Sequence, residues 1–141
     1  MRLSALLLAA IAAATSLPFL SPHALAADPA GLLPRYEAEA RAADPAFAGF
    51  SAERGKAIYF HEENRDGKPM SCTSCHTSDP TAAGKTPAFR SIKPLAPSAS
   101  PQRFTDATKV EKWLKRNCND VYARQCTAQE KGDFVSWIIQ Q

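Results

Sequence analysis

Two cysteines and a histidine stand together in CTSCH, from Cys72 to His76. This is the C-x-x-C-H pattern of c-type haem attachment. The chemistry needs that order, because two thiols add to the porphyrin vinyl groups and the adjoining histidine is then held beneath the iron. We therefore predict one covalent haem c per chain, attached through Cys72 and Cys75, with His76 as the proximal iron ligand.

Two other chemistries use a C-x-x-C pair. A zinc half-site would need further Cys or His ligands at plausible spacing. A thiol–disulfide redox motif does not call for the histidine that follows the second cysteine. The complete motif favours haem over both alternatives.

A sixth iron ligand is missing from its usual place. Electron-carrying cytochromes c of this kind place a methionine opposite the histidine, from a loop well downstream of the motif. The only methionines are Met1 and Met70, and the other histidines, His23 and His61, also lie upstream. The far side of the iron is therefore predicted to be open or to take an unusual ligand.

A carboxamide is the candidate for that position. Val110, Trp113, Leu114 and Asn117 follow one another at i, i+3, i+4 and i+7, the spacing of one helix face. A buried carboxamide without a partner costs roughly 1–3 kcal/mol, and iron could be the partner. The alternative is a core asparagine that backbone groups satisfy at the helix end.

An amide oxygen is a hard donor, which favours ferric over ferrous iron. Reduction should weaken the bond from Asn117 and open the site to dioxygen, nitric oxide or another diatomic gas. A one-electron reduction of the bound gas by this protein is a further reaction that the sequence allows. The rival is a plain electron carrier with permanently six-coordinate iron, and an enzyme proper would need an acid or base such as His61 over the iron.

The second cysteine pair, Cys118 and Cys126, brackets the segment NDVYARQ. A disulfide is expected if the protein is exported to an oxidising compartment. Its adjacency to Asn117 would fix that residue's position. The bond is either a staple for a small domain or a redox device that controls ligand access.

The elements around these residues are helical. Helices are predicted near 35–42, over 52–60 with Ser51 as N-cap, from Thr105 or Asp106 onward, and from the capping box at Thr127 to the C-terminus. Gly55 would permit a close helix crossing, and Ala57, Ile58 and Phe60 would offer apolar surface beside it. The last helix is expected to carry a broad apolar stripe of Phe134, Val135, Trp137, Ile138 and Ile139. Residues 77–104 contain five prolines, which exclude a long helix and predict a loop that wraps the haem edge.

The resulting fold class is all-α, a small helical domain wrapped around one haem with little or no strand. The first 26 residues have a charged start, an apolar run and an A-x-A site, so we predict a signal peptide over 1–26 and a monohaem cytochrome c domain over 27–141. Export places the domain in the periplasm.

The charge balance excludes one class of partner. Removal of Arg2 with the signal peptide lowers the formal charge from +3, which gives no basis for binding nucleic acid. Lys112, Lys115 and Arg116 share the polar side of their helix, as a solvated face or as a docking patch for an acidic donor. No heptad requires a partner, so we expect a monomer or a weak dimer.

Across residues 52–140 the chain resembles the Sphaeroides haem protein (SHP) class, oxygen-binding monohaem cytochromes c with an asparagine ligand. The resemblance rests on SCTSCH, PLAPSASPQRFTDATKVEKWLKRNCND and CTAQEKGDF, which occur in this order. It implies a class I cytochrome c fold, with His76 as the proximal ligand, Asn117 as the axial asparagine and Cys118–Cys126 as the disulfide.

The resemblance also implies function. Members are high-spin, lose the asparagine bond on reduction, and bind oxygen or nitric oxide. Their expected electron donors are dihaem c-type cytochromes and membrane-bound cytochrome b. The chain departs from the family at Pro87 to Ser91, where Phe89 stands near an expected glycine. Ligand access, potential or partner docking could differ there.

Overall fold

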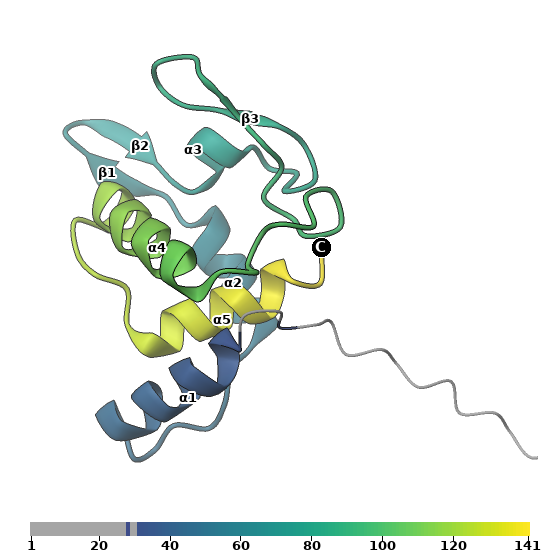
Figure 1. Ribbon diagram of the computed structural model, residues 1–141. Helices are drawn as coiled ribbons and strands as arrows, with labels where there is room; N and C mark the ends of the chain where they lie inside the picture. Colours follow the sequence, from purple (N-terminus) through teal and green to yellow (C-terminus); the bar gives the residue numbers. More distant parts are fainter. Residues whose placement is uncertain (1–27, 29–30) are drawn as a thin grey trace, which may run out of the picture.

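The computed structural model describes residue 28 and residues 31–141. The predicted signal peptide, 1–26, lies outside these residues and stays a prediction. Helices and short strands alternate in the described part of the chain (Figure 1). They are α1 (Leu32–Ala43), α2 (Ala52–Phe60), β1 (Glu63–Arg65), β2 (Lys68–Met70), α3 (Thr73–His76), β3 (Gly84–Lys85), β4 (Ser91–Ile92), α4 (Ala107–Tyr122) and α5 (Ala128–Ile138).

Side-chain caps start three of the helices where the sequence places them. The Ser51 side chain accepts from the N–H of Arg54 at the start of α2, and Asp106, rather than Thr105, caps α4. The capping box of Thr127 and Glu130 starts α5. These caps satisfy backbone donors that have no partner within the helix. The first helix begins at Leu32, earlier than predicted, and ends before Asp44.

Helices α2 and α5 cross at very short range, as predicted for Gly55. A Cβ atom added at Gly55 would lie 2.0 Å from the backbone oxygen of Asp133 and 2.9 Å from Cβ of Trp137. Only glycine lets the two backbones approach so closely. On the other side of α5, helix α1 contributes Leu32 and Tyr36 to the core (Figure 1).

The buried residues of α2 differ from those expected. Ala57 and Phe60 were expected to supply apolar surface, yet both are exposed, and the helix buries Gly55 and Tyr59 instead. Tyr59 packs against Trp137 of α5, with ring centroids 4.8 Å apart. The apolar stripe predicted for α5 is confirmed, since Phe134, Val135, Trp137 and Ile138 are all buried.

The exposure of α4 corrects one detail of its predicted stripe. Val110 is buried, and Leu114 and Asn117 are half-buried, but Trp113 is 42% exposed. The most buried residues of α4 are Val110, Cys118 and Val121, so its inward face is turned slightly away from Trp113. The Trp113 ring instead lies under the Arg116 guanidinium, 5.6 Å from the ring centroid.

Strands contribute little, in keeping with the predicted all-α class. β1 pairs with β2, and β3 with β4, each as an isolated antiparallel hairpin. The second hairpin lies inside the proline-rich segment 77–104, which otherwise forms turns and irregular loop. None of the helices in the described residues is both long and apolar enough to span a membrane.

Candidate haem site

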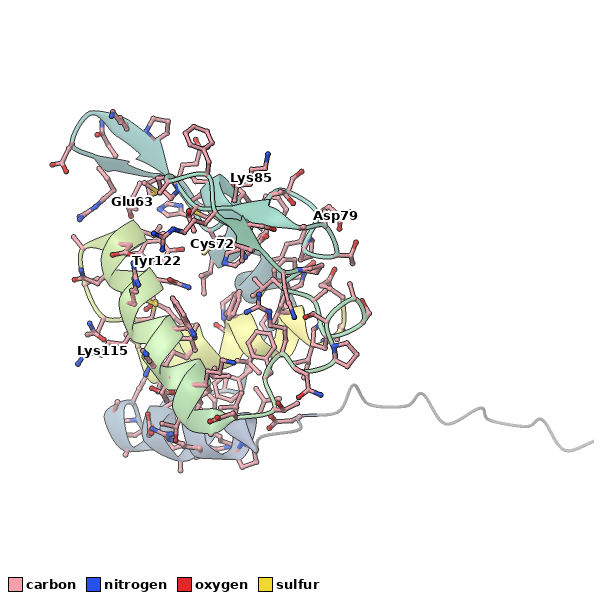
Figure 2. All side chains as sticks on the ribbon, turned by 45° about the horizontal axis from the view of Figure 1, so that its top comes forward. Glu63, Cys72, Asp79, Lys85, Lys115 and Tyr122 are labelled. Atoms are coloured by element: carbon pink, nitrogen blue, oxygen red, sulfur yellow. A yellow bond between two sulfur atoms is a disulfide. The ribbon has the colours of Figure 1, made fainter. Side chains whose placement is uncertain are left out.

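The C-x-x-C-H motif folds as a single helical turn. α3 spans Thr73–His76, and the N–H of His76 donates to the carbonyl of Cys72 at 3.0 Å. This turn brings both thiols and the imidazole to one short element, with Cys72, labelled in Figure 2, at its start. Cys72 and Cys75 are half-buried and are not bonded to each other or to another cysteine.

Two contacts that sequence reasoning missed hold this turn in place. The Tyr59 hydroxyl donates to the carbonyls of Thr77 at 2.7 Å and His76 at 3.2 Å. Gly84 of β3 lies so close to α3 that an added Cβ would stand 1.9 Å from the Cys75 oxygen. The end of α3 is therefore fixed by α2 on one side and by β3 on the other.

Burial keeps the donor groups of α3 neutral. Desolvation raises the pKa of the Cys72 thiol to about 11, although contact with the Tyr122 hydroxyl opposes the shift. Desolvation also raises the pKa of Cys75. It lowers the pKa of His76, and the positive charge of Arg103 lowers it further. The imidazole is therefore in its neutral form at pH 7, the form that binds metals.

Tyr122 joins the C-terminal end of α4 to the motif. Its hydroxyl donates to the carbonyl of Ile58 in α2 at 2.6 Å. Figure 2 shows Tyr122 and Cys72 near each other at the same side of the molecule. Both tyrosines, Tyr59 and Tyr122, thus link α2 to the elements that carry the predicted haem residues. A buried tyrosine near a haem motif usually has such a hydrogen bond, but its partner cannot be read from sequence.

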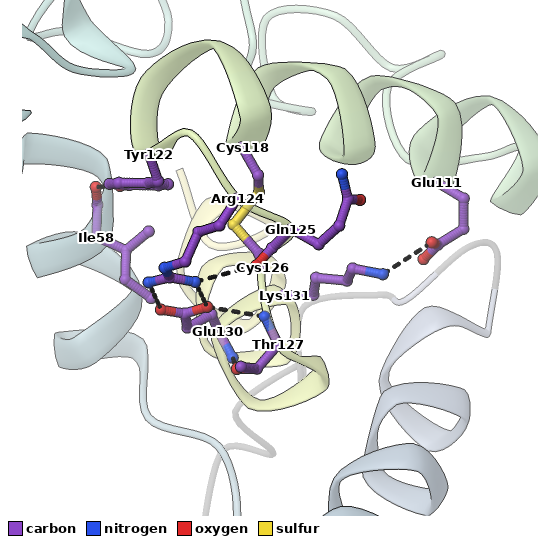
Figure 3. Close-up of a disulfide and its surroundings, with 10 residues drawn as sticks. All are labelled: Ile58, Glu111, Cys118, Tyr122, Arg124, Gln125, Cys126, Thr127, Glu130 and Lys131. Carbon is purple, nitrogen blue, oxygen red and sulfur yellow. Dashed lines mark hydrogen bonds and ion pairs between the residues drawn. A yellow bond between two sulfur atoms is a disulfide. The ribbon is translucent and has the colours of Figure 1, made fainter. Parts of the chain in front are cut away.

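Asn117 lies on α4, one residue before the disulfide. Its side chain is half-buried and makes no hydrogen bond to any described residue, so no backbone group satisfies the amide. Cys118 and Cys126 form a disulfide with their Cα atoms 5.7 Å apart (Figure 3). This covalent link ties the end of α4 to the start of α5, next to Asn117.

Comparison with known proteins identifies the family of this chain. A family model described as a domain of unknown function (DUF1924) matches residues 45–138. The cytochrome c-type protein SHP of Cereibacter sphaeroides is 50% identical over 86% of this chain and 92% of its own length. The chain belongs to the SHP class of c-type cytochromes. Membership means that it carries a covalently bound haem c.

Other relatives of this SHP-class chain agree. Cytochrome c'' of Methylophilus methylotrophus is 36% identical over 84% of this chain and 85% of its own length. The solved structure of oxidized SHP, described as an oxygen-binding cytochrome c, aligns with a TM-score of 0.71 at 47% identity, covering 80% of this chain and 96% of that chain. Oxidized cytochrome c'' aligns with a TM-score of 0.71 at 33% identity, covering 78% and 91%. The all-α cytochrome c fold is confirmed.

Four other side chains of this SHP-class chain that could bind iron lie outside α3, namely His61, Met70, Lys109 and Lys115. His61 is exposed at the end of α2, where its ring nitrogen bonds Glu63 at 3.1 Å. Met70 lies on β2 beside a surface hollow of about 350 Å³ that Asn119 and Asp120 also line. Lys109 and Lys115 are exposed on α4. His61, Lys109 and Lys115 are exposed, unlike Asn117, whereas Met70 is half-buried as Asn117 is.

The donor set fits a covalent haem. Two unbonded thiols stand three residues apart, a neutral imidazole follows them, and Gly84 allows the loop to lie directly against their backbone. The zinc alternative would need three or more clustered His, Cys, Asp or Glu side chains, and the described residues contain no such group. The arrangement therefore suits two thioether bonds and one axial nitrogen.

Proposed function

We propose that this protein is a high-spin periplasmic cytochrome that binds dioxygen or nitric oxide on its ferrous haem. Cys72 and Cys75 carry the thioether bonds of a single haem, and His76 is the proximal ligand. Asn117 is the distal ligand of the oxidised form and leaves on reduction. Partner cytochromes supply the electron.

The haem supplies an iron that changes valence and takes diatomic gases when ferrous. In this proposal the side chain of Asn117 controls whether a gas can reach the distal side of the iron. Asn117 offers a neutral amide oxygen, a hard donor that holds ferric iron better than ferrous. Once released, the amide of Asn117 can donate a hydrogen bond to a bound gas.

One observation carries this proposal: the half-buried side chain of Asn117 makes no hydrogen bond within the described part of the chain. Its amide atoms keep solvent access, so the amide can bind a ligand without breaking a hydrogen bond to the described residues. The disulfide at Cys118, the next residue, fixes the position of Asn117 at this end of α4. The relatives support the same reading, since SHP is described as oxygen-binding and work on cytochrome c'' concerns haem-ligand detachment.

The decisive experiment is the absorption spectrum of the anaerobically reduced holoprotein before and after addition of oxygen or nitric oxide. We expect high-spin bands that shift promptly when the gas is added. Asn117→Ala should change the ferric spectrum, remove the redox-linked loss of a ligand, and shorten the life of the oxygen complex by about tenfold, the worth of one hydrogen bond.

Asn119→Ala is the matched control, because Asn119 is an exposed carboxamide on the same helix. It should leave both the ferric and the gas-bound spectra as in the parent. Sharp low-spin ferrous bands that ignore added gas would overturn the proposal. The protein would then be a plain one-electron carrier, and Asn117 a residue of the helix packing only.

A further inference from the structure

The β3–β4 hairpin has a firmly held tip. Gly84 pairs with Ile92, and Lys85 with Ser91. Between them, the N–H of Thr86 donates to the Arg90 carbonyl at 2.9 Å, and the N–H of Phe89 to the Thr86 carbonyl at 2.8 Å. The Thr86 hydroxyl also accepts from the N–H of Arg90 at 3.1 Å. The tip therefore has a defined shape that it can present to a partner.

Phe89 is the large apolar residue at this tip, and its side chain lies almost wholly in solvent. It has a φ of 60°, in the left-handed region, and 87% of its surface is exposed. Phe104 has a φ of 59° but is only 7% exposed, within the core cluster. The left-handed conformation costs roughly 1–2 kcal/mol for a residue with a Cβ. Core packing offsets that cost at Phe104, whereas at Phe89 the hydrogen bonds of the hairpin tip hold the backbone and the ring itself stays in solvent.

The base of the hairpin lies on the haem-binding turn. Gly84 is buried, and an added Cβ would lie 1.9 Å from the Cys75 oxygen and 3.1 Å from Cα of His76. Figure 1 shows β3 beside α3. The five residue-to-residue steps from Gly84 to Phe89 span at most about 17 Å even when fully extended. A protein seated on the tip is therefore close to the residues that carry the haem.

The surroundings of Phe89 are basic. Residues 80–105 contain Lys85, Arg90, Lys93 and Arg103 and no acidic residue. Lys85, Arg90 and Lys93 are exposed, and no salt bridge among the described residues involves them. On the basic face of α4, Lys112 and Lys115 are likewise exposed and outside the salt bridges of the described residues. That face differs in its aromatic residue, because Arg116, paired with Asp120 at 3.6 Å, covers the Trp113 ring.

We propose that the β3–β4 hairpin is the docking element for an acidic electron-donor protein, with Phe89 as the apolar anchor and Lys85, Arg90 and Lys93 as its charged rim. An exposed aromatic surrounded by unpaired charges of one sign is the usual composition of such an interface. The inference rests on the proposed function in one respect, that electrons arrive from a partner protein.

A lipid surface is the competing occupant, since anionic headgroups would also attract these cations. The structure favours a protein. The apolar part of the tip is a single large side chain, flanked by Pro87 and Ala88, which is little to bury in a membrane. The position of the hairpin against α3 would serve electron transfer and has no use in membrane attachment.

The test is the second-order rate at which reduced flavodoxin, an acidic one-electron donor protein, reduces the ferric holoprotein. We expect Lys85→Gln/Arg90→Gln to lower this rate about 5–10-fold at low ionic strength and to flatten its salt dependence. Phe89→Gly keeps the backbone geometry and should lower the rate about threefold, with the salt dependence unchanged.

Lys112→Gln/Lys115→Gln is the matched control, because it removes the same charge from the exposed face of α4. It should alter the rate less than twofold, by long-range attraction only. An equal or larger loss in this control would overturn the proposal and place docking on α4. Co-sedimentation of the parent with phosphatidylglycerol vesicles, lost in Phe89→Gly without any change in rate, would overturn it in favour of a lipid surface.

Reduction by dithionite separates this inference from the proposed function. The small reductant needs no docking surface, so all three variants should be reduced at the parent's rate and bind gas as the parent does. If the spectrum of the reduced parent protein does not change when gas is added, the proposed function is contradicted. A defect confined to reduction by the donor protein concerns the hairpin alone.

Discussion

The α2–α5 crossing and the α3–α4 site satisfy their polar groups in opposite ways. At the crossing, the buried carboxylate of Asp133 accepts from the N–H of Ser51 at 2.7 Å, from the Arg54 guanidinium at 2.7 and 2.9 Å, and from the Gln129 amide at 2.9 Å. At the site, the amide of Asn117 and the thiols of Cys72 and Cys75 have no such set of partners.

This difference shows which region is stabilised by contacts within the polypeptide alone. The crossing pairs its buried carboxylate, Asp133, and closes the backbones around Gly55, so its stability comes from protein contacts. The site keeps its donors in rigid elements but leaves them for a bound group, as preorganised binding sites do. Substitutions at the crossing should therefore lower stability, while substitutions at the site should alter spectra and ligand binding.

Gly55→Val should have the largest effect on stability. The new Cβ would meet the backbone of Asp133 at 2.0 Å, and a backbone atom cannot turn aside as a side chain can. We expect the free energy of unfolding to fall by about 4 kcal/mol or more, so that little folded protein accumulates. Urea unfolding of the holoprotein measures it. Ala57→Val, at an exposed position of the same helix, should cost less than about 1 kcal/mol.

The helix boundaries could be predicted because their signals are local. Ser51, Asp106 and the pair Thr127–Glu130 each cap a helix through a contact three residues away. The two hairpins could not be predicted, since strands of two or three residues are too short for an alternating pattern. The C-x-x-C-H motif could be recognised because chemistry restricts its residue types and their order, while Asn117 as an iron ligand stays a prediction.

The support of the site could not be read from the sequence for a different reason. Tyr59 and His76 are 17 residues apart, and Arg54 and Asp133 are 79 apart. No periodicity links residues at such separations, so only the fold pairs them. One signal was present for Asp133: an acidic residue stands directly before the apolar run FVSWII, where a buried carboxylate would need a partner.

Asp133→Asn should have the second largest effect, because it removes a charge from a buried, fully paired site. Asp133 is 2% exposed, and the Arg54 guanidinium would lose its only carboxylate among the described residues. We expect a loss of about 2–4 kcal/mol in the free energy of unfolding. The ferric and gas-bound spectra should remain those of the parent.

Asp120→Asn provides the comparison with an exposed carboxylate. Asp120 lies 3.6 Å from Arg116, and both side chains are more than half exposed. Its loss should change stability by less than about 0.5 kcal/mol. Equal losses for Asp133→Asn and Asp120→Asn would mean that the crossing does not depend on its buried carboxylate, and the contrast between the two regions would fail.

A smaller effect than that of Asp133→Asn is expected where the two regions join, at the ion pair of Arg124 and Glu130 beside the disulfide (Figure 3). The Arg124 guanidinium holds the pKa of Glu130 below its usual value. A lowered folded-state pKa means that the pair stabilises the protein above the unfolded pKa of Glu130. That contribution is lost as the pH falls through the folded pKa.

Arg124→Gln should accordingly cost about 0.5–1 kcal/mol at pH 7, discounted for the solvent exposure of the pair. The difference between parent and variant should vanish once the pH lies below the lowered pKa of Glu130. Urea midpoints across the acidic range measure this. A difference that persists unchanged into acid would show that Arg124 acts through its packing on the Tyr122 ring, 5.6 Å from its guanidinium carbon, and not through its charge on Glu130.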